Sequence, residues 1–529
     1  MGSIKKPISM KNFYLIILSI LIISCSGGSD TSQLPDITIT TSSSEAKEAY
    51  LKAMDLYDQR RQATVEERKT LLNQALTLDP DFLLAKASLY SMLGTENNNK
   101  VLKDIYDARE SVSEMESKII EFLYNERTNF DPEVASYNIT MLTDEYPELW
   151  RLWYWSGVVK SYNPGEIYDA IDDLETALEI NPNHFGTKLF LIAKHLQFGG
   201  WGNTLPAEEI DLEFIKPMVD NVEENHLDNS YTHVVVGNYY RTLSQFDKAI
   251  ESYNKLEDFQ DQGVQNLYTA NHYRALANTF KNDFESAEFY FRKNVELGNQ
   301  FGAYSWLPQM FLFDNNFDAA ISVLDEFEEN LISLELPAQQ ELNSIVTINR
   351  LKFLCYAHNQ LEDESLQHIQ LTKESQLNAI NLRKNRSTEN EYNEQVKYAE
   401  YVEETFLIWH DILFGNYSNA KSKLNDYKSI SEKINRPNNL HNYYVLNALT
   451  ELNLGNPDKS LEYFNMTNKF NGFGDQIPLN DDYYTYFKGL ALSASGDLEG
   501  GKVLFNEIAS KNFYGIQPSL VRNLAKAQL

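Results

Sequence analysis

The sequence predicts an all-α fold, an α-solenoid built from antiparallel helix pairs. A helix-pair pattern with small residues at fixed positions recurs from about residue 46 onward. Its period ranges from 33 residues, between Ala287 and Ala320, to 41 residues, between Ser460 and Gly501. In addition, 43% of the 529 residues are hydrophobic and 12% are aromatic, so the chain can bury a substantial core. These observations favour a folded repeat array over a disordered acidic chain.

The first residues of the chain have the pattern of a secretion signal. Lys5, Lys6 and Lys11 form a positively charged start, and residues 13–23 form an apolar stretch. This stretch holds about a dozen residues, fewer than the ~20 that a membrane-spanning helix needs. A cleaved signal is therefore expected here in place of a permanent transmembrane anchor.

The end of this stretch, residues 21–25, reads Leu-Ile-Ile-Ser-Cys and resembles a bacterial lipobox. The resemblance implies that the signal, residues 1–24, is cut between Ser24 and Cys25. It also implies that the Cys25 thiol is diacylated and the new amino terminus acylated, so that several acyl chains make a stable anchor. Ser26 in place of Asp after the cysteine implies the outer membrane of a Gram-negative cell. An ordinary secretory signal with a chance cysteine is the alternative interpretation.

The repeat is clearest in the segment that begins at Tyr231. Gly237 lies within the first helix, Phe246 in the turn, Ala249 in the second helix and Tyr253 one turn later. The small residues are expected where the two helices cross, because a larger side chain would force them apart. Tyr253 is expected to fill the space beside that crossing.

The same frame recurs along the chain. The second helix carries a small residue at Ala135, Ala170, Ala249, Ala287, Ala320, Ala420, Ser460 and Gly501. The first helix carries a small residue at Gly157, Gly237, Ala275 and Gly489. This frame resembles the tetratricopeptide repeat, and together with the lipobox it resembles the tetratricopeptide lipoproteins of Bacteroidota. The resemblance implies a right-handed superhelix of about 9–11 repeats. An α-helical bundle with chance small residues is the alternative.

The pattern divides the chain into regions. Residues 25–45 are rich in Ser, Thr, Gly and Asp and predict a flexible tether. An N-terminal repeat array is expected over 46–334 and a C-terminal array over 401–529. Between them the phase is lost across 335–400, which predicts an irregular or degenerate region. Its polar run is expected to be either a long exposed helix or a loop, and to mark a break between two solenoid halves. Residues 518–528 predict a helix that caps the last hydrophobic face.

The family resemblance implies a protein or peptide ligand in the concave groove lined by the first helices. Mapping that face onto the sequence gives the candidate binding residues Arg151, Tyr154, Tyr231, Asn238, Arg241 and His272. The carboxylate clamp of some family members is not matched, because Val234 stands where a lysine is wanted. Binding of chaperone tails is therefore not expected.

Catalytic and metal-binding patterns are missing from the sequence. It has no glycine-rich phosphate loop, no G-x-S-x-G, no H-E-x-x-H and no calcium loop. Cys355 lies in an apolar helical stretch and is expected to be a buried structural thiol, although His358 and His368 follow it closely. We therefore expect no catalytic residue, no metal site and no cofactor, and the chain is not expected to be an enzyme.

The charge balance limits the partners. The sequence has 46 Lys and Arg against 76 Asp and Glu, a net charge of −30, which disfavours nucleic acids and anionic lipid surfaces. Contact with a membrane is expected through the lipid anchor only. The leading hypothesis is a protein-binding scaffold or assembly factor at the cell envelope. The alternative is a glycan-binding lipoprotein that resembles the SusD-like family, with Trp150 and Trp201 as stacking residues.

Overall fold

The computed structural model confirms an all-α fold. In the residues that it describes, every regular element is an α-helix or a short 3-10 helix. None of the described helices combines the length and apolar character that a membrane-spanning segment requires. The predicted signal and the lipidation site at Cys25 lie outside the described residues. The structure describes residues 34–58, 64–93, 96–128, 132–163, 165–196, 204–205, 209–384, 388–434, 438–468, 479, 482–511 and 520–529.

The first half of the array runs from α2 to α13. Its helices are α2 (Ser44–Asp58), α3 (Thr64–Leu78), α4 (Leu83–Leu93), α5 (Glu96–Asp107), α6 (Glu114–Thr128), α7 (Pro132–Glu145), α8 (Trp150–Lys160), α9 (Ile167–Ile180), α10 (Phe185–Lys194), α11 (Leu212–Asn225), α12 (Ser230–Thr242) and α13 (Phe246–Asn254). Short 3-10 segments follow α5 and α13, at η2 (Arg109–Ser111) and η4 (Lys255–Gln262).

The second half continues in the same way to the C-terminus. Its helices are α14 (Gln265–Lys281), α15 (Phe284–Glu296), α16 (Gln300–Phe313), α17 (Phe317–Leu331), α18 (Ala338–His358), α19 (Glu362–Leu382), α20 (Glu389–Leu413), α21 (Tyr417–Ser431), α22 (His441–Asn453), α23 (Pro457–Phe464), α24 (Asp482–Ser495), α25 (Leu498–Ala509) and α26 (Arg522–Lys526). One 3-10 segment, η5 (Ile332–Leu334), follows α17.

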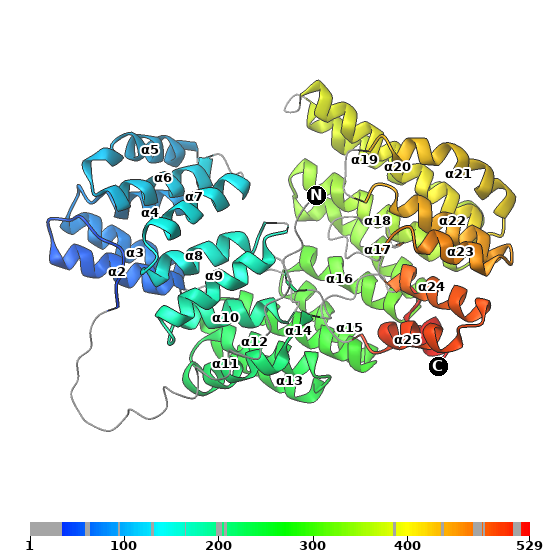
Figure 1. Cartoon of the computed structure of the whole chain (residues 1–529), viewed down its shortest axis with the longest axis horizontal. Helices are drawn as coiled ribbons and strands as arrows, with labels where there is room; N and C mark the ends of the chain where they lie inside the picture. Colours follow the sequence, from blue (N-terminus) through cyan, green and yellow to red (C-terminus); the bar gives the residue numbers. More distant parts are fainter. Residues whose placement is uncertain are drawn as a thin grey trace, which may run out of the picture.

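Each helix packs against the next one along the chain, which is the arrangement of a solenoid. Taken in order from α2–α3 to α24–α25, the described helices form twelve pairs, where about 9–11 repeats were expected. Several first helices also contact the next first helix, as α18, α20, α22 and α24 do in succession. Figure 1 shows the pairs following an open arc, with α2–α9 and α17–α25 as its two arms.

The small residues of the repeat lie where the helices of a pair cross, as predicted. A Cβ atom built on Gly237 would lie 2.2 Å from Cε1 of Tyr253. The equivalent atom on Gly489 would lie 2.7 Å from Cε1 of Phe505. The space beside each crossing is thus already filled by the aromatic residue of the second helix. This contact explains why glycine occupies these positions in the middle of a helix.

The region predicted to be irregular or degenerate, 335–400, consists mainly of long helices, so of the two readings of its polar run the helix agrees better with the structure than the loop. Helices α18 and α19 have 21 residues each, and α20 has 25. Thr388 and Glu391 form a capping box that starts α20 within the polar run. The phase was lost because these helices are longer than the repeat consensus. The expected break is also absent here, since buried hydrophobic residues form one cluster from Ala275 to Ala525.

Part of the predicted tether, residues 25–45, lies against the array. The backbone N–H of Thr40 donates to Glu116 Oε1 at 2.6 Å. The backbone N–H of Ser42 donates to Asp79 Oδ2 at 2.7 Å. These bonds hold the segment that precedes α2 against helices of the first repeats.

The C-terminal helix both covers the last pair and contacts a distant part of the array. Helix α26 packs on α25. Arg522 Nη2 donates to Asn282 Oδ1 at 2.6 Å, and the Arg522 guanidinium carbon lies 4.1 Å from the ring centroid of Phe313. Asn315 Nδ2 donates to the carbonyl oxygen of Leu520 at 3.0 Å. The predicted capping helix therefore also joins the last pair to the turns that follow α14 and α16.

Candidate binding surface on the first helices

The six predicted groove residues lie on three first helices and fall into two separate groups. Arg151 and Tyr154 belong to α8, whereas Tyr231, Asn238 and Arg241 of α12 lie near His272 of α14. Tyr231 and His272 are partly exposed, and the other four are buried. Their role in binding a ligand stays a prediction. Their surroundings, however, differ sharply between the two groups.

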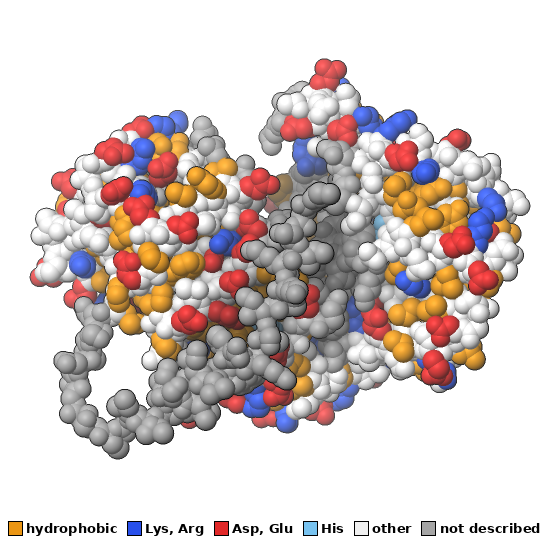
Figure 2. Space-filling model, viewed as in Figure 1, with side chains coloured by type: hydrophobic (Ala, Val, Ile, Leu, Met, Phe, Trp, Pro, Cys, Tyr) orange, Lys and Arg blue, Asp and Glu red, His pale blue; other side chains and the backbone are white. Residues whose placement is uncertain are grey.

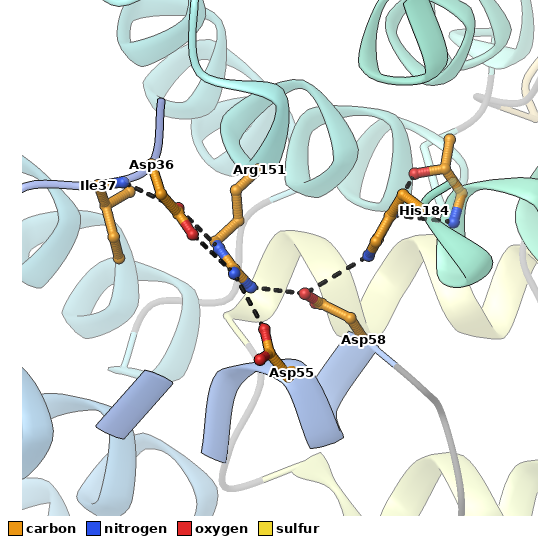
Figure 3. Close-up of polar contacts among 7 residues, drawn as sticks. Asp36, Ile37, Asp55, Asp58, Arg151 and His184 are labelled. Carbon is orange, nitrogen blue, oxygen red and sulfur yellow. Dashed lines mark hydrogen bonds and ion pairs between the residues drawn. The ribbon is translucent and has the colours of Figure 1, made fainter. Parts of the chain in front are cut away.

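The α8 group is organised around Arg151, which is 2% exposed. Its Nη1 donates to Asp58 Oδ2 at 2.5 Å, and Nε and Nη2 each donate to Asp36 at 2.9 Å. Nη2 also lies 3.2 Å from Asp55 Oδ1 (Figure 3). Burial opposes the charge on Arg151, but these three carboxylates outweigh burial and raise its pKa. All three guanidinium nitrogens thus face carboxylates of this chain.

His184 extends this ion-pair cluster to a fourth segment of the chain. Its Nε2 lies 3.6 Å from Asp58 Oδ2, and its Nδ1 lies 2.6 Å from the Thr187 hydroxyl at the start of α10 (Figure 3). The ring of Trp150 lies 4.3 Å from the His184 ring. The cluster therefore joins residues before α2, the end of α2, α8 and the start of α10. Removing one member of the cluster would leave a buried charge without its partner, which is strongly destabilising.

The aromatic residues of α8 pack inside the array. Tyr154 is buried between His184, with ring centroids 4.8 Å apart, and Phe190, with centroids 6.0 Å apart. Trp150 is also buried, and the Arg151 guanidinium lies 4.5 Å from its ring. Trp201 lies outside the described residues. The contacts of Trp150 therefore favour packing over the stacking role that a glycan-binding protein would need.

The α12 group is organised around Arg241, which is fully buried. None of its three guanidinium nitrogens has a hydrogen-bond partner. Asn238, one turn earlier on α12, is equally buried, and its Nδ2 also lacks a partner. The Oδ1 atom of Asn238 accepts a hydrogen bond from the Tyr253 hydroxyl at 3.0 Å. The Arg241 guanidinium carbon lies 5.9 Å from the ring centroid of Tyr273 on α14.

His272 connects this group to the next first helix, α16. Its ring centroid lies 5.1 Å from that of Trp306 and 5.3 Å from that of Tyr273, both partly exposed. Burial and, after it, the positive charge of Arg241 lower the pKa of His272 to about 4. The imidazole is therefore neutral at physiological pH. The structure thus places two buried side chains with donor atoms that lack partners, Arg241 and Asn238, beside an uncharged and partly exposed aromatic surface.

Sequence reasoning found the arginines but missed their surroundings. Asp36 and Asp58 lie 115 and 93 residues from Arg151 in the sequence, so no local pattern could connect them. Tyr273 follows directly on His272, yet the groove pattern selects only one of the two. The environment of Arg241 could not be predicted, because its unusual feature is a lack of hydrogen-bond acceptors, which no sequence pattern records.

The structure also locates the remaining candidate residues. Cys355 is buried as predicted, and burial raises the pKa of its thiol. Nδ1 of His358 lies 2.9 Å from the carbonyl oxygen of Leu354, and Nδ1 of His368 lies 2.9 Å from Asn349 Oδ1. Among the described residues, no group of three or more His, Cys, Asp or Glu could hold a metal ion.

The comparisons with known proteins give information about the fold only. No protein-family model matches the chain, and no curated protein matches it. A crystal structure of the APC/C hetero-tetramer Cut9–Hcn1 is similar at 15% identity, covering 87% of this chain and 76% of that chain, with a TM-score of 0.34. Yeast Tom70 is similar at 11% identity, covering 91% and 95%, with a TM-score of 0.30. Naa15/Naa10 bound to HypK-THB is similar at 12% identity, covering 87% and 68%, with a TM-score of 0.24. Likenesses this distant carry no information about what the chain binds.

Proposed function

We propose that the chain is a lipid-anchored binding protein of the bacterial cell envelope, without catalytic activity. Cys25 carries the anchor, and the first-helix surface of the array binds a segment of a partner protein. The protein acts as a scaffold or assembly factor. The anchor and the envelope location are supported by the lipobox in the sequence, and the binding role is supported by the architecture.

The observation that carries the binding role is the succession of first helices. Where α18, α20, α22 and α24 contact one another, they present a continuous row of side chains from many repeats. Solenoids use such extended surfaces to bind other proteins, because each repeat adds a few contacts. At α12, α14 and α16 the first helices meet through side chains, Arg241 with Tyr273 and His272 with Trp306. Tyr231, His272 and Trp306 are partly exposed there. Aromatic side chains of this kind contribute strongly to protein interfaces.

The charge of the chain narrows the class of partner. Figure 2 shows acidic side chains distributed over both arms of the array. With a net charge of −30, the protein repels polyanions at long range. A protein segment that is neutral or basic overall is therefore the partner that the electrostatics favour.

The anchor is tested by metabolic labelling with a clickable palmitate analogue in a Gram-negative host. We expect the wild-type chain to incorporate the label and to appear in the outer-membrane fraction. The Cys25→Ser variant should remain unlabelled and unprocessed. Equal labelling of both chains, or none of the wild type, would exclude lipidation at Cys25.

The binding surface is tested by photo-crosslinking in the same cells. A photoreactive phenylalanine analogue replaces Trp306 on α16 or, in a second chain, His272 on α14. As a matched control it replaces Phe289, which is 60% exposed on the second helix α15. We expect a discrete protein adduct from the first two positions and none from the control. Adducts of equal yield at all three positions, or at none, would count against the first-helix surface.

A further inference from the structure

Arg241 stands apart from the other arginines. Of the arginines that the structure describes, it alone has all three guanidinium nitrogens buried without a hydrogen-bond partner. Arg274, on the neighbouring first helix, donates to Glu257 Oε1 at 2.7 Å. Arg522 donates to Asn282 Oδ1. A buried cation without a compensating anion is strongly unfavourable, so its position in the array calls for a counter-charge from elsewhere.

The groups around Arg241 define what kind of counter-charge fits. Nδ2 of Asn238 is a second buried donor one helical turn away, and it faces the Tyr273 hydroxyl. The acceptor oxygen of Asn238 is already occupied by the Tyr253 hydroxyl. The Tyr273 hydroxyl beside them can donate or accept. Donors therefore outnumber acceptors at the site. A carboxylate, with two oxygens in one plane, matches the forked guanidinium and can accept from a neighbouring amide as well.

The rest of the surface favours a single carboxylate over a polyanion. The net charge of −30 repels a segment that carries many negative charges. The walls next to Arg241 are aromatic, since Tyr273 lies 5.9 Å away and stacks on Tyr253 with ring centroids 5.3 Å apart. Such walls exclude water and strengthen one well-placed ion pair.

We propose that Arg241 and Asn238 bind one carboxylate presented by a partner protein segment that is otherwise neutral or basic. Tyr273 and His272 of α14 line this carboxylate site. The inference rests on the proposed function, because it names the chemistry by which the first-helix surface recognises its partner. The guanidinium is buried in this structure, so the proposal requires the partly exposed ring of Tyr273 to move when the carboxylate binds.

The test uses acetate as the probe and the His272 ring as the reporter. The purified protein, with ¹³C-labelled histidine, is titrated by NMR in sodium acetate or in sodium chloride of equal ionic strength. The titration is done at pH 7, where acetate is fully ionised. We expect acetate, but not chloride, to shift the ring signals of His272 in a saturable way, because the anion binds beside this ring. Arg241→Met should abolish the response to acetate. Arg292→Met, which removes an arginine from the second helix α15, should leave it intact.

A second variant and a second anion provide further tests that could reject the proposal. If Arg241→Met does not fold, Arg241→Lys keeps the charge but loses the fork, and we expect it to need several-fold more acetate. A response to inorganic phosphate at lower concentration than to acetate would overturn the assignment to a carboxylate. Unchanged His272 signals in wild type on addition of acetate, or an equal response in Arg241→Met, would overturn the site itself. A response to acetate without crosslinking at His272 would instead reject the proposed function and leave the site standing.

Discussion

Arg151 and Arg241 occupy comparable places in the array but have opposite surroundings. Both lie on first helices, α8 and α12, and both are at most 2% exposed. Arg151 donates to three carboxylates, from Asp36, Asp55 and Asp58, whereas Arg241 has no hydrogen-bond partner. The first arginine is therefore part of what holds the N-terminal arm together. The second makes no such bond, and its donors are those that we propose bind the carboxylate of a partner.

The largest expected effect is on the stability of the N-terminal arm. Arg151→Met leaves Asp58, which is 4% exposed, without its counter-charge. Removing one partner of a buried ion pair typically costs about 3–5 kcal/mol of unfolding free energy. Urea denaturation of the purified protein measures this loss.

The matched variant at the second site should behave differently. Arg241→Met removes a buried charge that has no partner, so we expect an unchanged unfolding free energy or an increase of up to about 1–4 kcal/mol. A loss at Arg241→Met as large as that at Arg151→Met would mean that both arginines are structural.

A smaller effect is expected at the helix crossing that positions Asn238 and Arg241. Gly237→Ala brings a Cβ atom to 2.2 Å from the Tyr253 ring, and Tyr253 also donates to Asn238. Overpacking of this kind costs about 1–3 kcal/mol. The double variant with Tyr253→Val should lose less unfolding free energy than the sum of the single variants, because the smaller side chain makes room for the methyl group. Additive losses would show that the two residues are not in contact.

The docking of the N-terminal segment should depend on pH. The Thr41 hydroxyl and the Ser42 N–H donate to Asp79 and lower its pKa from 3.8 to about 2. The stabilisation from this carboxylate is present above about pH 4 and is lost as the pH falls toward 2. We therefore expect the unfolding free energies of wild type and Asp79→Asn to differ at pH 5 and to converge between pH 4 and 2. A difference that stays constant over this range would contradict the assignment.

The smallest effect concerns the ionisation of His272. Arg241→Met should raise the pKa of His272 above its value of about 4, because one of the two causes of its depression is removed. The pKa should stay below 6.5, since burial is the larger cause. With its folded-state pKa depressed, the histidine makes stability fall as the pH drops from about 6.5 toward 4. A histidine titration by NMR measures this shift, and no change would place His272 outside the field of Arg241.

The local repeat was predictable, and the long-range contacts were not. The frame of Gly237, Ala249 and Tyr253 located the helix crossings, because a crossing needs small and large residues at fixed positions on neighbouring helices. The ion pairs of Arg151 depend on residues about a hundred positions away, which no periodicity records. The repeat frame was lost across α18–α20 because the length of these helices departs from the repeat consensus.

The burial of the groove residues also could not be predicted from the sequence. Their positions on the first helices followed from the repeat frame, but their exposure depends on how neighbouring pairs pack. Tyr154, for example, contacts Phe190 and His184, which belong to or precede α10. The contact of Arg522 with Asn282 likewise depends on the path of the whole second half of the array.

The most direct test compares the guanidinium signals of the two arginines in one sample. In an NMR titration with sodium acetate at constant ionic strength, the ¹⁵Nε–H signal of Arg241 should shift and saturate. The corresponding signal of Arg151 should stay in place, because carboxylates of the chain already occupy its donors. A stationary Arg241 signal, or equal shifts of both signals, would contradict the account of Arg241 as a carboxylate site.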